Sequence, residues 1–286
     1  MKLRCRDRVL PLDRVAIMGV LNVTPDSFSD GGLWFDRAAA MDHGREMVER
    51  GASIVDVGGE STRPGATPVP ADEELRRVIP VVEALSAEGA VVSIDTRKTE
   101  VARAAVTAGA SIVNDTSGEE SDRGMDELAA QTGAAIVVMH SRGTPETMRT
   151  LTDYDDVVWD VRDFLAHRAE ELVAAGVPSD AIALDPGFGF AKTPDQNLVL
   201  LRRLRELSDN PYPLLAGTSR KSFIGKVLDL PEDQRIEGTA ATVAWAVACG
   251  ARLVRVHDVE QMVRVVRMTE AILESGGQET TFDLTP

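Results

Sequence analysis

Cysteine and positive charge are both scarce in this chain of 286 residues. The two cysteines, Cys5 and Cys249, lie far apart and without metal-ligand spacing, so we expect reduced thiols rather than a disulfide framework or a zinc site. Lys and Arg number 31 against 46 Asp and Glu, which gives a net charge of −15. Such a surface repels polyanions, and this argues against a protein that binds nucleic acid or an anionic membrane.

Long apolar runs are also missing. The longest, at 238–250, is shorter than the roughly 20 residues that a membrane-spanning helix needs. The first residues lack the apolar core of a secretion signal, and we therefore expect a cytoplasmic protein. There is no HExxH motif, Cys/His cluster, EF-hand loop or Walker P-loop, so the sequence argues against a tightly ligated transition metal.

A regular alternation of short aliphatic runs with amphipathic helical stretches fills most of the chain. The predicted strands cover residues 16–22, 53–58, 91–95, 111–115, 135–139, 181–185, 213–217 and 253–257. The predicted helices cover residues 36–50, 71–87, 98–108, 123–132, 155–175, 194–207, 221–249 with a break near Pro231, and 258–274. This pattern is typical of parallel β/α units.

Eight such units without a linker predict a single-domain α/β fold over residues 1–286, a (β/α)8 TIM barrel, whose usual size is about 250 residues. We expect residues 1–14 to form a short hairpin that plugs the barrel floor and residues 275–286 to form a flexible tail. An open, doubly wound sheet is the alternative architecture, but no change of composition marks its two halves.

Polar residues follow most of the predicted strands. They include Asn22, Glu60, Thr62, Asp95, Asn114, Asp115, His140, Asp185, Ser219, Lys221, Arg255 and His257. Any one of them is more readily a cap or turn residue. Because the carboxyl ends of all barrel strands meet at one face, however, their convergence predicts a site at the barrel mouth.

The last strand predicts an anion site within this acidic chain. Arg255 and His257 share a strand face with Leu253, so both point at the mouth if Leu253 packs inward. Together with Asn22 and Thr62 from neighbouring strands, they suit a phosphate or pyrophosphate, since Arg gives bidentate bonds and His a further donor. We treat both as cations.

A second group predicts a pocket for a flat heterocycle. The carboxylates of Asp95 and Asp185, the amide of Asn114 and the ammonium of Lys221 can satisfy amino, ring N–H and carbonyl groups on the edge of such a ring. Two simpler interpretations remain open, namely an ion pair of Lys221 with Asp185 and an ion pair of Arg255 with a carboxylate such as that of Asp258. Asp56, inside the second strand, is more readily a buried scaffold residue.

Three glycine-rich loops, at residues 24–32, 58–68 and 185–194, accompany these residues. Their composition fits mobile lids, chiefly after the first two strands. The loop residues best able to sandwich an aromatic ring are Phe28, Pro64 and Phe190. A helix that begins near Ser222 can offer free N–H groups to a carboxylate.

The strings MGVLNVTPDSFSDGG, DVGGESTRPGA, SIDTRK, ASIVNDTSG, DPGFGFAKT, GTSRKSFIG and RVHDV follow one another between about residues 16 and 258. This series resembles the successive motifs of the dihydropteroate synthase family of the folate pathway. The resemblance implies a transferase that joins 6-hydroxymethyl-7,8-dihydropterin pyrophosphate to p-aminobenzoate and releases pyrophosphate. It also implies a homodimer, Mg2+ as cofactor and sulfonamides as competitors.

Residue roles follow from the same resemblance. It assigns the pterin to Asp95, Asn114, Asp185 and Lys221. It assigns the diphosphate to Asn22, Thr62, Arg63, Arg255 and His257, with Asn22 also ligating Mg2+. It assigns p-aminobenzoate to Phe28, Thr62, Pro64, Phe190, Lys221 and Ser222. The catalytic residues that it implies are Asp95, Arg63, Lys221, Arg255 and His257.

Two departures from the family pattern stand out. Ala191 replaces the usual Gly, and MHSRGTPETM after the fifth strand leaves the roles of Ser141 and Arg142 open. The rival functions are a methyltetrahydrofolate:corrinoid methyltransferase, a Schiff-base aldolase that uses Lys221, and a non-catalytic paralogue. The intact first and second loops argue against the paralogue.

Overall fold

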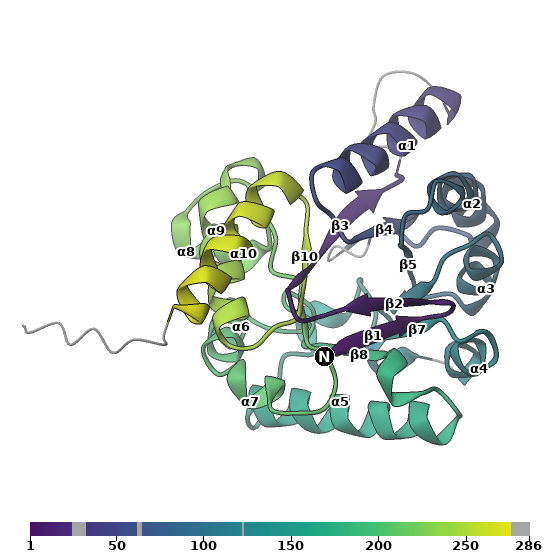
Figure 1. Ribbon diagram of the computed structural model, residues 1–286. Helices are drawn as coiled ribbons and strands as arrows, with labels where there is room; N and C mark the ends of the chain where they lie inside the picture. The colour runs from purple at the N-terminus through teal and green to yellow at the C-terminus, as the bar shows by residue number, and fades with distance from the viewer. Residues whose placement is uncertain (25–32, 62–64, 122, 276–286) are drawn as a thin grey trace, which may run out of the picture.

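Eight parallel strands surrounded by helices make up the fold (Figure 1). The computed structural model describes residues 1–24, 33–61, 65–121 and 123–275. The predictions for Phe28, Thr62, Arg63 and Pro64, and those for nearly all of the tail, therefore lie outside the described residues.

The strands of the barrel are β3 (Ala16–Asn22), β4 (Ile54–Gly58), β5 (Val92–Thr96), β6 (Ile112–Asp115), β7 (Ala135–Met139), β8 (Ile182–Asp185), β9 (Leu215–Ala216) and β10 (Leu253–Val256). Each of β3 to β7 pairs in parallel with the next strand, and β10 pairs with both β9 and β3. A parallel bridge between Leu184 and Leu214 joins the two ends of this order. The predicted TIM barrel is confirmed.

The helices are α1 (Leu33–Glu49), α2 (Ala71–Ala87), α3 (Thr99–Thr107), α4 (Arg123–Thr132), α5 (Val157–Ala174), α6 (Pro194–Arg202), α7 (Arg205–Ser208), α8 (Ser222–Leu228), α9 (Ile236–Ala248) and α10 (Val259–Glu274). Gly51 and Gly109 end α1 and α3 with φ angles of 102° and 118°, which glycine adopts at low cost. The helix predicted over 194–207 divides in two, because Arg203 leaves helical geometry at the end of α6. None of the helices in the described ranges is long and apolar enough to cross a bilayer.

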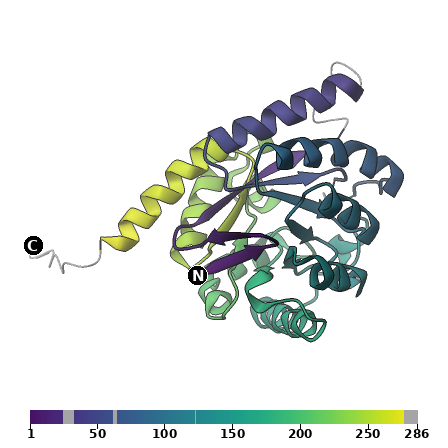
Figure 2. The ribbon, with the colours of Figure 1, turned by 45° about the vertical axis from the view of Figure 1, so that its right-hand side comes forward.

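The N-terminal hairpin, β1 (Lys2–Cys5) and β2 (Arg8–Pro11), lies across one end of the barrel in both views (Figures 1 and 2). Leu3, Cys5 and Leu12 are fully buried in one apolar cluster with inward-facing strand residues such as Met18 and Leu253. Burying these side chains removes apolar surface from water and stabilises this end of the barrel. Because Leu253 does pack inward, the residues at alternate positions after it face along the barrel interior.

Both cysteines are free, as expected, and both are buried. Burial raises the pKa of the Cys5 thiol to about 12. A thiol that stays protonated at neutral pH is a poor nucleophile, so Cys5 acts as a small apolar residue of the core.

Candidate active site

A cavity of about 850 Å3 lies at the carboxyl ends of the strands. Its lining includes these sequence-predicted residues: Asn22, Asp95, Phe190, Lys221, Ser222, Arg255 and His257. Asn114 and Asp185 are almost fully buried and hydrogen-bond within the adjoining wall. The chain thus brings residues from both ends of the sequence to one mouth, as the strand order requires.

Arg255 is the centre of the ionic network in this wall. Its Nε donates to Oδ2 of Asp56 at 2.6 Å, and its Nη2 donates to Oδ2 of Asp95 at 2.5 Å. Arg255 therefore does pair with carboxylates. They are not that of Asp258, however, which forms an ion pair with Arg220 instead.

Asp56 is the scaffold residue that the sequence indicates. It is fully buried, and its Oδ2 accepts both from Arg255 and, at 3.0 Å, from Nδ2 of Asn114. The amide of Asn114 on β6 is thereby oriented by a residue of β4, which lies two strands away in the barrel. Its Oδ1 has no hydrogen-bond partner among the described residues, which makes it an acceptor that a bound N–H group can satisfy.

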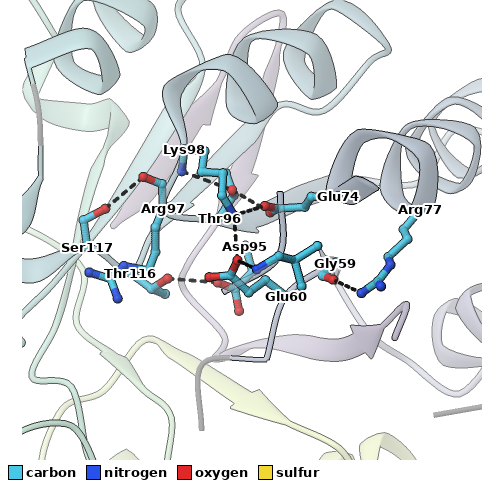
Figure 3. A network of polar contacts seen from close by, with 11 residues as sticks. Gly59, Glu60, Glu74, Arg77, Asp95, Thr96, Arg97, Lys98, Thr116 and Ser117 are labelled. Atoms are coloured by element: carbon cyan, nitrogen blue, oxygen red, sulfur yellow. Dashed lines mark hydrogen bonds and ion pairs between the residues drawn. The ribbon is translucent and has the colours of Figure 1, made fainter. Parts of the chain in front are cut away.

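Asp95 lies on β5 beside Asn114 of β6. Burial raises the pKa of Asp95 to about 7; the charge of Arg255 opposes this shift, whereas the charge of Asp56 adds to it. The Oγ1 of Thr116 also donates to Oδ1 of Asp95 at 3.2 Å (Figure 3). A carboxyl group that titrates near neutral pH inside a cavity is typical of a functional site.

Asp185 ends β8 and is almost fully buried. Burial raises the pKa of Asp185, although the N–H of Gly187 donates to its Oδ1 at 2.7 Å and the charges of Lys221 and Arg255 favour the anion. Lys221 and Asp185 are therefore electrostatic neighbours.

The ammonium of Lys221 also lies over an aromatic ring. Its Nζ is 4.1 Å from the centre of the Phe190 ring, which is the geometry of a cation–π contact. Lys221 directly precedes α8, whose first residue is Ser222. Phe190, Lys221 and Ser222 therefore line the same cavity, and they come from the loops after β8 and β9 and from the first residue of α8.

The surroundings of His257 favour a neutral imidazole over the second cation expected from the sequence. Burial lowers the pKa of His257 to about 3, and the charges of Arg255 and Arg220 lower it further. Its Nδ1 lies 3.0 Å from Oγ of Ser219, which also accepts from the backbone N–H of His257 at 3.2 Å. A hydroxyl that accepts from this N–H can donate its own hydrogen to Nδ1, which leaves Nε2 as the imidazole donor.

Glu60 belongs to a supporting network beside the site (Figure 3). Its Oε2 accepts from Nζ of Lys98 at 2.6 Å and from the N–H of Val69 at 2.8 Å. Lys98 also donates to Glu74, which is fully buried on α2. These bonds join the segments after β4 and β5 to each other and to α2, so Glu60 is a structural residue.

Sequence reasoning missed Lys192. This residue lies in the string DPGFGFAKT, yet it is buried, and its Nζ lies 3.0 Å from Nδ1 of His140. His140 is buried as well and packs edge-on against Phe164, with ring centres 5.0 Å apart. Lysine side chains are mostly exposed in proteins, so a lysine in a glycine-rich loop is expected to face solvent. Nothing in the sequence around Lys192 indicates that it is buried.

The two departures from the family pattern have structural roles. The guanidinium of Arg142 lies 3.9 Å from the centre of the Tyr154 ring and donates to the carbonyl of Asp153 at 2.6 Å, so it stabilises the loop after β7. Ser141 is buried. Ala191 has a left-handed φ of 46°, the conformation that favours the glycine of the family pattern.

The family model described as pterin binding enzyme matches residues 18–257. A dihydropteroate synthase of Synechocystis sp. is 49% identical to this chain over 261 residues, 91% of this chain and 90% of the relative. This chain belongs to the dihydropteroate synthases, a family of pterin-binding enzymes. The resemblance drawn from the seven sequence motifs is thereby confirmed.

Solved dihydropteroate synthases share the whole fold. The Xanthomonas albilineans enzyme with 4-aminobenzoic acid has a TM-score of 0.89 and 44% identity, and the match covers 95% of this chain and 98% of that one. The Yersinia pestis enzyme in complex with a sulfonamide drug has a TM-score of 0.90 and 43% identity, over 96% of this chain and 100% of that one. Both are complexes with small molecules.

Proposed function

We propose that this protein condenses 6-hydroxymethyl-7,8-dihydropterin pyrophosphate with p-aminobenzoate to form 7,8-dihydropteroate and pyrophosphate. The observation that carries the proposal is the contact of Arg255 with Asp95 in the wall of one cavity, within a chain that belongs to the dihydropteroate synthases. We assign sulfonamides as competitors of p-aminobenzoate, as the Yersinia pestis complex suggests.

Asp95, Asn114, Asp185 and Lys221 form the pterin half of the site. The unpartnered Oδ1 of Asn114 accepts a ring N–H, and the carboxylates of Asp95 and Asp185 accept from amino and ring N–H groups. Lys221 donates to a ring acceptor. The anion of Asp95 then lies beside the ring, where it stabilises positive charge that develops during the reaction.

Arg255, His257 and Asn22 form the diphosphate half, together with Thr62 and Arg63 from the family resemblance. Nε and Nη2 of Arg255 donate to the carboxylates of Asp56 and Asp95, so the N–H groups of Nη1 and the second N–H of Nη2 remain for phosphate oxygens. The neutral His257 donates from Nε2. These donors stabilise the charge that the leaving group acquires.

Substitution proceeds dissociatively in this proposal. The C–O bond breaks first, and its electron pair leaves with pyrophosphate. The reduced pterin ring releases electrons to the methylene cation, while the anion of Asp95 supports it. The neutral arylamine then forms the C–N bond and loses its proton once it is bonded, so no strong general base is needed.

The aminobenzoate half comprises Phe190, Lys221 and Ser222, with Phe28, Thr62 and Pro64 from the resemblance. Phe190 offers a ring face for the arylamine. Lys221 and the hydroxyl of Ser222 offer donors to its carboxylate. A bound carboxylate would lie close to the ammonium that covers the Phe190 ring.

Mg2+ fits this donor set. It is commonly held by one or two protein oxygens together with substrate phosphates and water. Asn22 ends β3 at the mouth, half-buried, and offers one amide oxygen there. Bound Mg2+ would neutralise charge on the diphosphate. Activity that is lost in EDTA and restored by added Mg2+ supports this assignment, and full activity in EDTA contradicts it.

We also propose a homodimer in the cytoplasm. Apolar side chains that are 43–62% exposed gather on α8, α9 and α10, namely Val227, Leu228, Trp245, Met268, Ile272 and Leu273. These helices are neighbours on one side of the barrel (Figure 1). An exposed apolar area of this kind is typical of a protein interface. Two free thiols fit a reducing compartment.

The deciding experiment measures dihydropteroate and pyrophosphate together. The proposal expects both products in equal amounts, and only when p-aminobenzoate is present. A corrinoid methyltransferase would transfer a methyl group without releasing pyrophosphate. A non-catalytic paralogue would bind the pterin without turnover, and an aldolase would be trapped at Lys221 by borohydride with a carbonyl substrate.

A further inference from the structure

Lys192 carries a buried amino group that contacts several oxygen and nitrogen acceptors. Its Nζ donates to the carbonyl of Gly187 at 3.0 Å, to that of Phe190 at 3.1 Å and to Nδ1 of His140 at 3.0 Å. A longer contact of 3.4 Å reaches the carbonyl of His140. One ammonium thus joins both ends of the turn at 187–190 to the end of β7.

Further bonds show that this turn is held in one conformation. The hydroxyl of Tyr154 donates to the carbonyl of Ala191 at 2.9 Å, and Oδ1 of Asn197 accepts from the N–H of Gly189 at 2.7 Å. Ala191 itself is in the left-handed region, with a φ of 46°. An alanine persists there only where surrounding contacts fix the backbone, and Lys192 directly follows it.

We propose that Lys192 is a positioning residue for the aminobenzoate half of the site. By holding the carbonyls of Gly187 and Phe190, it fixes the ring of Phe190 beneath the ammonium of Lys221. This inference rests on the proposed function, because it assigns p-aminobenzoate as the substrate that meets Phe190. Lys192 does not line the cavity, so it acts through the loop rather than on the substrate.

The choice of lysine points to this role rather than to stability alone. Burying a cation without a bonded carboxylate is costly, and an apolar side chain would fill the same space more favourably. Asp185 is the carboxylate whose charge favours the ammonium, whereas Lys221 and Arg142 disfavour it. The pKa of His140 is far below its usual value because of burial, so its Nδ1 is available as an acceptor.

The test compares Lys192→Met with wild type and with Lys2→Met, a control at the hairpin end of the barrel, where Lys2 is largely exposed. We expect the KM for p-aminobenzoate to rise about tenfold in Lys192→Met, as the loss of charge-assisted bonds to the loop implies. The KM for the pterin pyrophosphate should change less than about threefold, because the sheet holds Asp185 through the bond from the N–H of His140 to its carbonyl. Lys2→Met should match wild type.

The pH dependence of the KM for p-aminobenzoate distinguishes a positioning role of Lys192 from a purely structural one. Burial lowers the pKa of Lys192 to about 7, and a neutral amine has only two N–H donors for three close acceptors. The wild-type KM for p-aminobenzoate should therefore rise from pH 7 to pH 9, whereas that of Lys192→Met should be nearly flat.

Tyr154→Phe serves as a milder second variant, because it removes only the hydroxyl bond to Ala191. It should raise the KM for p-aminobenzoate in the same direction, by about threefold. An unchanged KM in Lys192→Met, or in Tyr154→Phe if Lys192→Met does not fold, overturns the inference. An equal rise for both substrates overturns it too. Wild-type protein that makes no dihydropteroate would instead overturn the proposed function.

Discussion

Nη2 of Arg255 lies 2.5 Å from Oδ2 of Asp95. The cation that we assign to the diphosphate and a carboxylate that we assign to the pterin therefore form one ion pair. Asp56 holds the same guanidinium from the other side, through Nε at 2.6 Å. The two halves of the site are consequently coupled by charge before either substrate enters.

Removing either partner of this pair should impair turnover. We expect Asp95→Ala and Arg255→Ala each to lose about 3 kcal/mol of transition-state stabilisation, roughly a hundredfold in kcat/KM, because both are preorganised charges in a buried site. The double variant should lose less than the sum, since the residues interact directly.

Steady-state kinetics of the three variants measure this coupling. Asp180→Ala is the matched control, because it breaks an ion pair with Arg4 at the hairpin, on a different part of the barrel. Near-normal turnover in both single variants would remove Asp95 and Arg255 from the catalytic residues.

The pH profile should follow the ionisation of Asp95. Because burial raises the pKa of Asp95 to about 7 and the mechanism uses its anion, kcat/KM for the pterin pyrophosphate should increase from pH 6 to pH 8 and then level off. His257, with a pKa of about 3, should not contribute in this range. The measurement is made at saturating p-aminobenzoate, which separates it from any change at Lys192. A flat wild-type profile would contradict the role of Asp95.

Local patterns predicted the fold well, and the mouth residues followed from it. The period of apolar residues and the glycines after helices place strands such as β3 and helices such as α2 with the observed bounds. Strand order then brings Asp95, Lys221 and Arg255 to one cavity without any knowledge of side-chain contacts.

The contacts within the site could not be predicted from the sequence, because they depend on packing between strands that are distant along the chain. Arg255 and Asp56 are 199 positions apart, and nothing local to either residue selects the other. The neutral state of His257 depends on burial and on charges that only the assembled barrel supplies. The chain departs from helical geometry at Arg203, which divides α6 from α7. No proline or glycine at this point predicts the break.

The hairpin should contribute strongly to stability. Leu3 is fully buried among inward-facing strand residues, so Leu3→Ala should lower the free energy of unfolding by about 2–4 kcal/mol through lost burial and the cavity left behind. Val9→Ala, at an exposed position of the same hairpin, should change it by less than about 0.5 kcal/mol. Urea unfolding followed by circular dichroism measures both. Equal effects would show that the hairpin is not anchored through Leu3.

A charged side chain on α10 should separate the proposed dimer. Ile272 is 59% exposed next to Met268 on the same helix, and burial of such a side chain between subunits stabilises association by about 1.5–3 kcal/mol. Ile272→Glu replaces that gain with the cost of burying a charge, so sedimentation velocity should show a shift from dimer to monomer at micromolar concentration. Val173→Glu, on the exposed face of α5, is the matched control and should stay dimeric. If wild type sediments as a monomer, there is no dimer to separate, whereas a dimer in both variants places the interface away from α10.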